Sequence, residues 1–358
     1  MQSFWHGKRV LITGHTGFKG SWLSLWLHNL GAEVVGYALQ PPTHPSLFET
    51  INLQKNITSI HGNILDRENL AGTFEKFKPE IVFHLAAQPI VRKSYAEPID
   101  TFNTNVMGTV NLLDVVRKSD SVKVVVNVTS DKCYENKEWT WGYRETEPMG
   151  GHDPYSCSKG CSELITNSFR NSYLNEQNIH LASARGGNVI GGGDWAEDRL
   201  VPDIIKSLSN NQFPIIRNPY AIRPWQHVLE PLSGYKLLAE KLWEEGHKYA
   251  EGWNFGPENE NIITVSELVN QLMSFWGIND EAACAIDSSI QPHEAQLLKL
   301  DSSKAKYKLG WNQRLTIDQT LEWTTDWYRA FMNHADMQKF TLSQIEAYEK
   351  LRSNNNGM

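Results

Sequence analysis

The run Val10-Leu-Ile-Thr-Gly14-His-Thr-Gly17-Phe-Lys-Gly20 decides the fold of this chain. Its apolar beginning predicts a short buried strand, and its GxxGxxG spacing predicts a tight turn into the helix that follows. Glycines at such a junction permit the turn, let the backbone approach a pyrophosphate closely, and let the helix pack against its strand. The run therefore predicts a dinucleotide site, whose candidate cofactor-binding residues are Gly14, Thr16, Gly17, Phe18 and Gly20.

Strand-like and helix-like stretches alternate after this turn. Further strands are predicted at Glu33–Ala38, Ile57–His61, Ile81–Leu85 and Lys123–Thr129, and helices at Arg67–Phe77, at Asn103–Lys118 and from Tyr155 onward. Strands alternating with helices indicate βαβ units and a parallel sheet with helices on both faces. The fold class we expect is α/β, a Rossmann-type doubly wound parallel sheet with a smaller mixed C-terminal substrate lobe.

The regular alternation weakens after about Gly186. Later helices are predicted near Pro202–Ser209, Leu229–Glu245, Val265–Trp276 and Ile317–Met332, between loops rich in glycine and proline. The length of 358 residues is too great for a dinucleotide unit alone. We therefore expect residues 1–186 to form the dinucleotide-binding domain with the catalytic residues. Residues 187–358 would then form mainly the substrate lobe, interleaved with returning sheet segments.

Composition and charge exclude several classes of protein. The net charge of -7, without any basic run, predicts no nucleic-acid partner. No stretch reaches the roughly 18 apolar residues of a membrane span, and signal-peptide features are missing, so we expect no membrane partner and a cytoplasmic protein. The four cysteines do not suggest a disulfide framework, and no histidine spacing indicates a metal site.

A second motif, Tyr155-Ser-Cys-Ser-Lys159, indicates proton chemistry. Positions i and i+4 share one face of a helix, so the phenol and the ammonium group would lie side by side. A nearby cation favours the phenolate, and we expect it to lower the pKa of Tyr155 toward a range useful for a base. Ser130, at the end of the fifth predicted strand, would bring a hydroxyl group to the same site.

The second predicted strand does not identify the cofactor. The dinucleotide fingerprint places an acidic residue about 20 residues after the glycines, where it binds the ribose 2′-hydroxyl. Here the strand continues as Val35-Gly-Tyr-Ala-Leu-Gln-Pro41, without an acid and without an arginine for a 2′-phosphate. Charge therefore does not distinguish NAD from NADP.

Together these motifs resemble the extended short-chain dehydrogenases/reductases that act on nucleotide sugars. The resemblance rests on the GxxGxxG run, His84-Leu-Ala-Ala87 after the fourth strand, Ser130 and the YxxxK pair. Thr-Asp-Glu after the fifth strand marks the 4,6-dehydratases of that family, whereas this chain has Ser130-Asp131-Lys132. The Asp-Lys variant resembles the branch acting on CDP-glucose, as do Pro41-Pro-Thr-His-Pro-Ser-Leu-Phe48 and His293-Glu294…Leu298-Lys-Leu-Asp301.

The resemblance implies a three-stage reaction of CDP-glucose on one tightly held NAD. Tyr155 would take the C4 hydroxyl proton as hydride leaves C4, water would be lost across C5–C6, and hydride would return to C6. Lys159 would hold the nicotinamide ribose, Ser130 would hydrogen-bond the C4 oxygen, and Asp131 would protonate the departing C6 hydroxyl. The alternative is a 4-epimerase of the same family, which shares Ser130, Tyr155 and Lys159 but needs no acid–base pair for elimination.

Lys132 departs from the family pattern, because relatives have glutamate as the base that takes the C5 proton. An ammonium group accepts no proton unless burial or a neighbouring cation lowers its pKa. We expect a neutral Lys132 to act as this base. The alternative role of Lys132 is electrostatic stabilisation of the enolate.

The resemblance also implies further binding residues. The remaining cofactor-binding candidates are Asn63, Ile64, Leu85, Ala86, Ala87, Tyr155 and Lys159, with Asn63 standing where the family has aspartate. The substrate-binding candidates are Asn188, Arg223 and Asn254. Family members usually form homodimers through the helices near Asn103–Lys118 and Tyr155–Leu174. The apolar residues Val106, Val110 and Leu113 fit either that contact or burial against the sheet.

Overall fold

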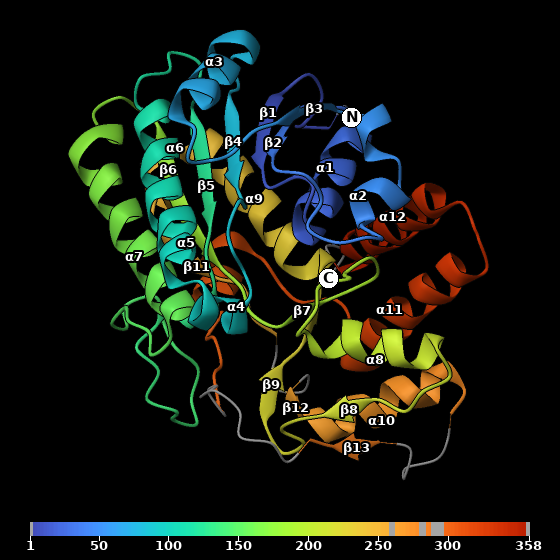
Figure 1. The fold of residues 1–358 in the computed structure, drawn as a ribbon. Helices are drawn as coiled ribbons and strands as arrows, with labels where there is room; N and C mark the ends of the chain where they lie inside the picture. The colour runs from blue at the N-terminus through green and yellow to red at the C-terminus, as the bar shows by residue number, and fades with distance from the viewer. Residues whose placement is uncertain (1–2, 258–261, 279–283, 288–296, 356–358) are drawn as a thin grey trace.

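The computed structural model describes residues 3–257, 262–278, 284–287 and 297–355 (Figure 1). His293 and Glu294 lie outside these described residues, whereas Leu298–Asp301 of the same sequence motif lie within them.

A seven-stranded parallel sheet forms the centre of the molecule, with strand order β11-β6-β5-β4-β1-β2-β3. Its strands are β1 (Arg9–Thr13), β2 (Glu33–Ala38), β3 (Thr58–His61), β4 (Ile81–His84), β5 (Val124–Val128), β6 (His180–Arg185) and β11 (Gly252–Asn254). Successive side chains of a strand point to opposite faces. In β1, Val10 and Ile12 accordingly join one buried apolar cluster, and Leu11 joins the other.

Helices cover both faces of this sheet (Figure 1). They are α1 (Phe18–Asn29), α2 (Leu47–Thr50), α3 (Arg67–Phe77), α4 (Val91–Ala96), α5 (Pro98–Phe102), α6 (Gly108–Val116), α7 (Pro154–Phe169), α8 (Leu200–Ser209), α9 (Leu229–Glu245), α10 (Val265–Trp276), α11 (Ile317–Met332) and α12 (Met337–Asn355). Side chains of α1, α9, α11 and α12 belong to the larger apolar cluster, and those of α3 and α6 to the second. The predicted Rossmann-type doubly wound sheet is confirmed.

The remaining strands form three small two-stranded sheets below the carboxyl ends of the central strands (Figure 1). They pair β7 (Val189–Ile190) with β10 (Gln226–His227), β8 (Ile215–Ile216) with β13 (Ala285–Ile286), and β9 (Ile222–Pro224) with β12 (Ile262–Thr264). We call β8, β9, β12 and β13, with helices α8 and α10, the C-terminal lobe. In parallel sheets ligands bind at the carboxyl ends of the strands, so the lobe stands on the side where a site is expected.

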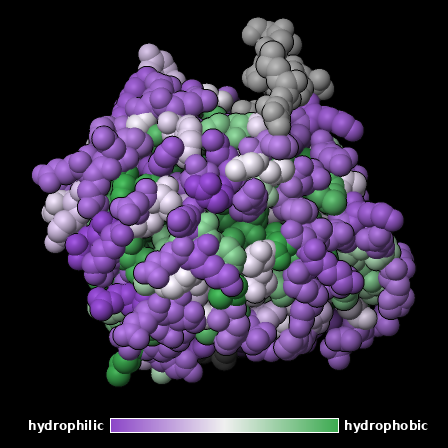
Figure 2. Space-filling model, turned by 90° about the horizontal axis from the view of Figure 1, so that it is seen from above, coloured by the Kyte–Doolittle hydropathy of each residue, from purple (hydrophilic) through white to green (hydrophobic). Residues whose placement is uncertain are grey.

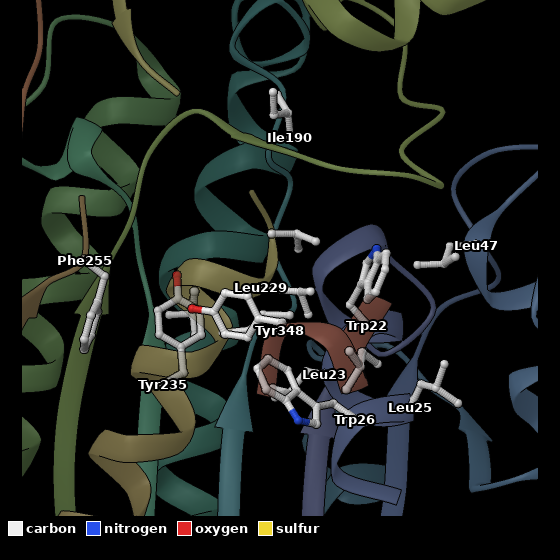
Figure 3. Packing of buried hydrophobic residues seen from close by; sticks show 14 of the residues in the cluster. Trp22, Leu23, Leu25, Trp26, Leu47, Ile190, Leu229, Tyr235, Phe255 and Tyr348 are labelled. Carbon is white, nitrogen blue, oxygen red and sulfur yellow. The ribbon is translucent and has the colours of Figure 1, made fainter. Parts of the chain in front are cut away.

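Three helices of the second half start and end where the sequence predicts them, namely α9, α10 and α11, and in the first half α3 does so as well. The prediction did not include β6, β11 or α12. Strand β11 pairs with β6 and completes the sheet from a part of the chain far beyond residue 186. The C-terminal helix α12 lies against α1, where Trp26 and Tyr348 meet edge to face with ring centroids 5.8 Å apart (Figure 3).

The side of the molecule away from the C-terminal lobe is largely hydrophilic, with a few hydrophobic side chains visible in its centre (Figure 2). Within the described residues, the helices include none that is both long and apolar enough to cross a membrane.

Candidate active site

The glycine-rich turn between β1 and α1 is shaped by close backbone contacts. Gly14 has a φ of +76°, and a Cβ placed there would lie 2.8 Å from the backbone nitrogen of Ala86. A Cβ at Gly20 would lie 2.1 Å from the carbonyl oxygen of Gly14. Gly17 is different, because its Cβ would meet only the Gly14 oxygen, at 3.4 Å. Two of the glycines are therefore required for packing, whereas Gly17 presents an open backbone at the start of α1.

The start of α1 suits the pyrophosphate of a dinucleotide. Gly17 is the N-cap residue and has no side chain, and the first turn of α1 contains no acidic residue. The free amide groups at a helix N-terminus and the helix dipole both favour an anion. In the same turn Thr16 is tied down through a bond from its hydroxyl to the Leu39 carbonyl oxygen, 3.0 Å away. The residues of this turn fit the cofactor that the sequence predicts.

The end of β4 lies beside the glycine turn. The amide groups of Leu85 and Ala86 each donate to the Thr13 hydroxyl at 3.2 Å, which holds the segment Leu85–Ala87 against β1. His84 is buried and shares a 2.7 Å hydrogen bond with that hydroxyl through Nδ1. Burial lowers the pKa of His84 to about 3, so the ring is neutral. The two loops form one continuous backbone surface at the carboxyl edge of the sheet.

The adenine-side candidates Asn63 and Ile64 have different surroundings. The Asn63 side chain is exposed and accepts a bond from the Leu65 amide at 2.9 Å, which makes a local turn. Ile64 is buried, and its side chain would be only 2.8 Å from a Cβ at Gly108. Gly108 thus lets the start of α6 pack against Ile64 in the loop after β3, and an adenine contact by Asn63 remains a prediction.

Ser130 and Asp131 follow β5 and begin a 3₁₀ turn, Asp131–Cys133. The Ser130 hydroxyl donates to Oδ1 of Asp131 at 2.9 Å and accepts from the Lys132 amide at 3.2 Å. Asp131 is buried against Gly187, where a Cβ would lie 1.9 Å from its Oδ2. Lys132 is half-buried beside this carboxyl group. A hydroxyl and a carboxyl group therefore stand together at the sheet edge, and Lys132 follows them directly in the chain.

Helix α7 brings Tyr155 to this group. Asp153 caps the helix by accepting from the Ser156 amide at 2.9 Å, and Pro154 occupies the first helical position. The Tyr155 amide donates to the Ser94 hydroxyl at 3.2 Å, and the Tyr155 side chain is hydrogen-bonded with Ser130. The predicted meeting of Tyr155 with Ser130 therefore occurs.

The acidity of Tyr155 differs from the expectation. Burial raises its pKa to about 12, and the bond with Ser130 and the charge of Arg199 offset this only in part. The expected lowering of the Tyr155 pKa is therefore wrong for the chain by itself. Its physical reason is desolvation, which disfavours the phenolate more than nearby cations favour it.

Lys159 lies one turn further along α7 and is also buried. Burial lowers its pKa to about 8, while the charge of Glu163 acts in the opposite direction. Glu163 accepts from Arg185 at both carboxylate oxygens, at 2.9 and 2.8 Å, and from Ser183 at 2.6 Å. The ion pair of Glu163 with Arg185 fixes the helix to the end of β6 directly behind Lys159.

Sequence reasoning missed two cations of this site, Lys19 and Arg199. Lys19 stands in the first turn of α1, where burial lowers its pKa to about 8 and Arg199, Asp131 and Lys159 also influence it. Arg199 donates to Oδ2 of Asp194 at 2.7 Å and acts electrostatically on Tyr155. Lys19 could have been predicted from its position inside the glycine-rich run. Arg199 could not, because only the fold brings it close to Lys19 and Tyr155.

The three substrate-binding candidates are placed unequally. Asn188 follows Gly187 at the edge of the site, with a φ of +42°. Arg223 is buried on β9, where its guanidinium donates to the Ile222 carbonyl oxygen at 3.1 Å. Asn254 is completely buried at the end of β11.

The side chain of Asn254 is fully used inside the protein. Its amide donates to the carbonyl oxygens of Tyr143 at 2.8 Å and Asp301 at 3.1 Å, and its oxygen accepts from the Tyr134 hydroxyl at 2.8 Å. These three hydrogen bonds give Asn254 a structural role, and its contact with substrate stays a prediction.

Known proteins resemble this chain in sequence over most of its length. The family model described as GDP-mannose 4,6 dehydratase matches residues 11–324. The chain belongs to this family. CDP-glucose 4,6-dehydratase of Salmonella typhimurium is 56% identical over 352 residues, which cover 97% of this chain and 98% of that protein. The predicted resemblance to the nucleotide-sugar dehydratases is thereby confirmed.

Solved structures of similar fold include dehydratases and epimerases of nucleotide sugars. A dTDP-glucose 4,6-dehydratase from Streptomyces venezuelae, with NAD bound, has a TM-score of 0.79 at 22% identity and covers 92% of this chain and 99% of that one. UDP-glucose 4-epimerase from Thermotoga maritima has a TM-score of 0.78 at 24% identity and covers 90% of this chain and 99% of that one. At these identities the similarity concerns the fold alone, which the dehydratase and the epimerase have in common.

Proposed function

We propose that this chain is an NAD-dependent CDP-glucose 4,6-dehydratase, a hydro-lyase that converts CDP-glucose to CDP-4-keto-6-deoxyglucose and water. The observation that carries the proposal is the 56% identity to the Salmonella typhimurium enzyme over nearly the whole of both chains. The adjacent Asp131 and Lys132 beside Ser130 and Tyr155 supply the acid and the base that an elimination needs.

The first stage is oxidation at C4 of the sugar. Tyr155 takes the proton of the C4 hydroxyl, and Ser130 hydrogen-bonds the same oxygen. NAD, when bound, accepts hydride from C4 and later returns it to C6. Lys159 holds the nicotinamide ribose, and the positive charges of Lys159 and Arg199 stabilise the phenolate while Tyr155 holds no proton.

The second stage is loss of water. The new C4 ketone acidifies the C5 proton, and Lys132 is the proposed base that removes it. Asp131 gives its proton to the C6 hydroxyl, the C6–oxygen bond breaks, and water leaves a C5–C6 double bond. Hydride addition at C6 and return of a proton to C5 complete the 4-keto-6-deoxy sugar.

The role of Lys132 can be separated from electrostatic stabilisation. Reaction in deuterium oxide places deuterium at C5 when a protein base exchanges its proton with solvent. We expect Lys132→Ala to lose this exchange. Normal exchange in that variant would contradict the assignment of Lys132 as the base and leave it as a stabiliser of the enolate.

We propose that the diphosphate of the substrate binds near Arg223. Arg223 and Asn188 are its proposed ligands, and the planar guanidinium of arginine suits phosphate oxygens. Because the whole chain carries a net charge of -7, local cations must hold the anionic substrate against the net negative charge of the protein.

Incubation of the purified protein with CDP-glucose, UDP-glucose and dTDP-glucose, each with NAD, tests the proposal. We expect the 4-keto-6-deoxy product from CDP-glucose, detected by its alkaline absorbance. Recovery of an epimer without the ketone would assign the chain as a 4-epimerase. Preference for UDP-glucose or dTDP-glucose would agree with the proposed 4,6-dehydration but would contradict CDP-glucose as the substrate.

We further propose a homodimer that forms through α6, α7 and the turns beside them. Leu113 is buried in the core, so it does not contribute to such a contact. Met107, Leu164 and Tyr173, by contrast, are large apolar residues exposed on these elements. Leu164→Glu should shift the protein from dimer to monomer in sedimentation velocity. An unchanged sedimentation coefficient would contradict this surface.

The compartment we propose is the cytoplasm. All four cysteines are free thiols, as expected for a protein kept in a reducing environment. Fractionation of the producing cells, with the protein detected by antibody, tests this compartment, and recovery outside the cytoplasmic fraction would contradict it.

A further inference from the structure

Tyr235, on α9, carries a hydroxyl group that its packing does not explain. The side chain is completely buried, and its hydroxyl has no hydrogen-bond partner among the residues that the structure describes. Figure 3 shows its ring beside Phe255, with the hydroxyl directed toward the segment that leads to Ile190. An unsatisfied buried hydroxyl costs about 1–3 kcal/mol. Phenylalanine would fill the same space without that cost, so the hydroxyl requires another reason.

The hydroxyl faces the dipeptide Gly186-Gly187, which also contacts the proposed acid. A Cβ at Gly186 would lie 3.0 Å from the Tyr235 hydroxyl oxygen. A Cβ at Gly187 would lie 1.9 Å from Oδ2 of Asp131. The approach at Gly187 requires glycine, because a side chain there would occupy the space of the carboxyl group, and a Cβ at Gly186 would make a tight contact with the phenol oxygen.

A second unsatisfied polar atom lies at the same dipeptide. Gln226 is completely buried, and its amide donates to the carbonyl oxygens of Gly187 at 3.1 Å and Phe255 at 2.9 Å. Its oxygen Oε1 has no partner among the described residues. The Phe255 carbonyl oxygen is also 3.5 Å from the position of a Gly186 Cβ, so the carbonyl group that Gln226 bonds lies on the face of Gly186 that the Tyr235 hydroxyl approaches.

We propose that the Tyr235 hydroxyl and the Gln226 oxygen hold one buried water molecule that hydrogen-bonds the Asp131 carboxyl group, which makes Tyr235 a positioning residue for the acid. A buried water needs two to four polar partners, and these three groups supply them. The water accepts from the phenol, and donates to Gln226 and to the carboxyl group. This inference rests on the proposed function, because it assigns the support of the residue that protonates the C6 hydroxyl.

The electrostatics agree with this arrangement. Burial raises the pKa of Tyr235, so its hydroxyl keeps its proton and remains a donor. The Ser130 hydroxyl already holds Oδ1 of Asp131 at 2.9 Å. The bridging water would restrain the carboxyl group from the other side, so that its proton meets the departing C6 oxygen. Loss of one hydrogen bond to such a group should slow the reaction about tenfold to hundredfold.

The variant that tests this inference is Tyr235→Phe, which removes only the hydroxyl. We expect kcat with CDP-glucose to fall at least tenfold while KM stays within about twofold, because the proposed water acts on the acid and not on substrate binding. The matched control is Thr325→Val on α11, which also removes a buried hydroxyl that has no partner among the described residues. We expect the control to keep the wild-type kcat. A wild-type kcat in a folded Tyr235→Phe protein would overturn the proposal.

A crystal structure of the wild-type protein gives a readout that does not depend on activity or on the folding of a variant. We expect a water oxygen within hydrogen-bond distance of the Tyr235 hydroxyl, Gln226 Oε1 and the Asp131 carboxyl group. Well-resolved density without this water would overturn the proposal. If wild-type protein failed to convert CDP-glucose and the water were present, the proposed function would fail while the water site would stand.

Discussion

The catalytic end of the sheet and the C-terminal lobe differ in how their side chains are satisfied. Near β5, β6 and α7, polar groups are buried in bonded networks, such as Glu163 with Arg185, Ser183 and Thr129. The small strands of the lobe and the loops beside them expose large apolar side chains, among them Phe213, Ile215, Tyr220 and Ile286. Catalytic side chains must be held in position before the substrate binds. A surface that binds a ligand can expose apolar side chains, because the bound ligand then covers them.

The largest expected difference between the two regions concerns activity. Tyr155→Phe removes the proposed base and should lower kcat about 10²–10⁴-fold, with little change in the melting temperature. The comparison variant is Tyr220→Phe in the lobe, where the side chain is 86% exposed. We expect that variant to retain its kcat when product formation from CDP-glucose is measured. Equal losses in both variants would erase the distinction between the regions.

Ion pairs sharpen the comparison through stability. Glu163→Gln leaves Arg185 buried without its charge partner and should cost about 3–5 kcal/mol of unfolding free energy in urea titrations. The control is Asp198→Asn, which disrupts partly exposed pairs with Arg217 and Arg92. Its cost should be about 0–1 kcal/mol. A small loss for Glu163→Gln would show that the buried network contributes little to stability.

The packing of α9 against the C-terminal helix α12 should respond to pH through Glu230 on α9. Its carboxylate accepts from the Arg314 and Leu315 amides and from the Tyr348 hydroxyl, so it joins α9 to α12. Burial raises its pKa to about 7, above the usual 4.5. A raised carboxyl pKa contributes stability that is complete below pH 4.5 and is lost as pH rises toward 7.

The lost contribution should amount to about 3 kcal/mol across this pH range, as the shift in pKa implies. Urea titrations at several pH values measure it. Glu230→Gln removes the titrating group, so the variant should lose this component of the pH dependence whatever its absolute stability. A variant with the wild-type slope would assign the pH dependence to other groups.

The smallest expected effects are the changes in stability when either of two glycines in the first half of the chain is replaced by alanine. Gly20→Ala puts a methyl group 2.1 Å from the Gly14 oxygen and should destabilise the protein by about 1–3 kcal/mol and weaken NAD binding. Gly72→Ala in α3 meets no atom within 4 Å and should stabilise it by about 0.5–1 kcal/mol. Thermal melts and NAD titrations measure both effects. Changes of the same sign would contradict the assignment of Gly20 to a packed turn.

The sequence was informative where spacing along one element decides the outcome. The glycine run fixed the turn after β1, and four helices have their predicted ends because apolar periodicity marks them. Tyr155 and Lys159 share α7 because their separation of four residues puts them on one face. The joint appearance of Ser130, Asp131 and Lys132 with this pair also indicated the family to which the chain belongs.

The tertiary structure decided which distant groups meet and how burial changes them. Arg199 reaches the space of Tyr155, Asn254 is fully used by Tyr134, Tyr143 and Asp301, and β11 joins the sheet from the second half of the chain. Burial also raises the pKa of Tyr155, contrary to the expectation from its spacing to Lys159. Local spacing follows from the geometry of a single helix or strand. Hydration and long-range partners exist only once the elements have packed, so they cannot be determined from spacing alone.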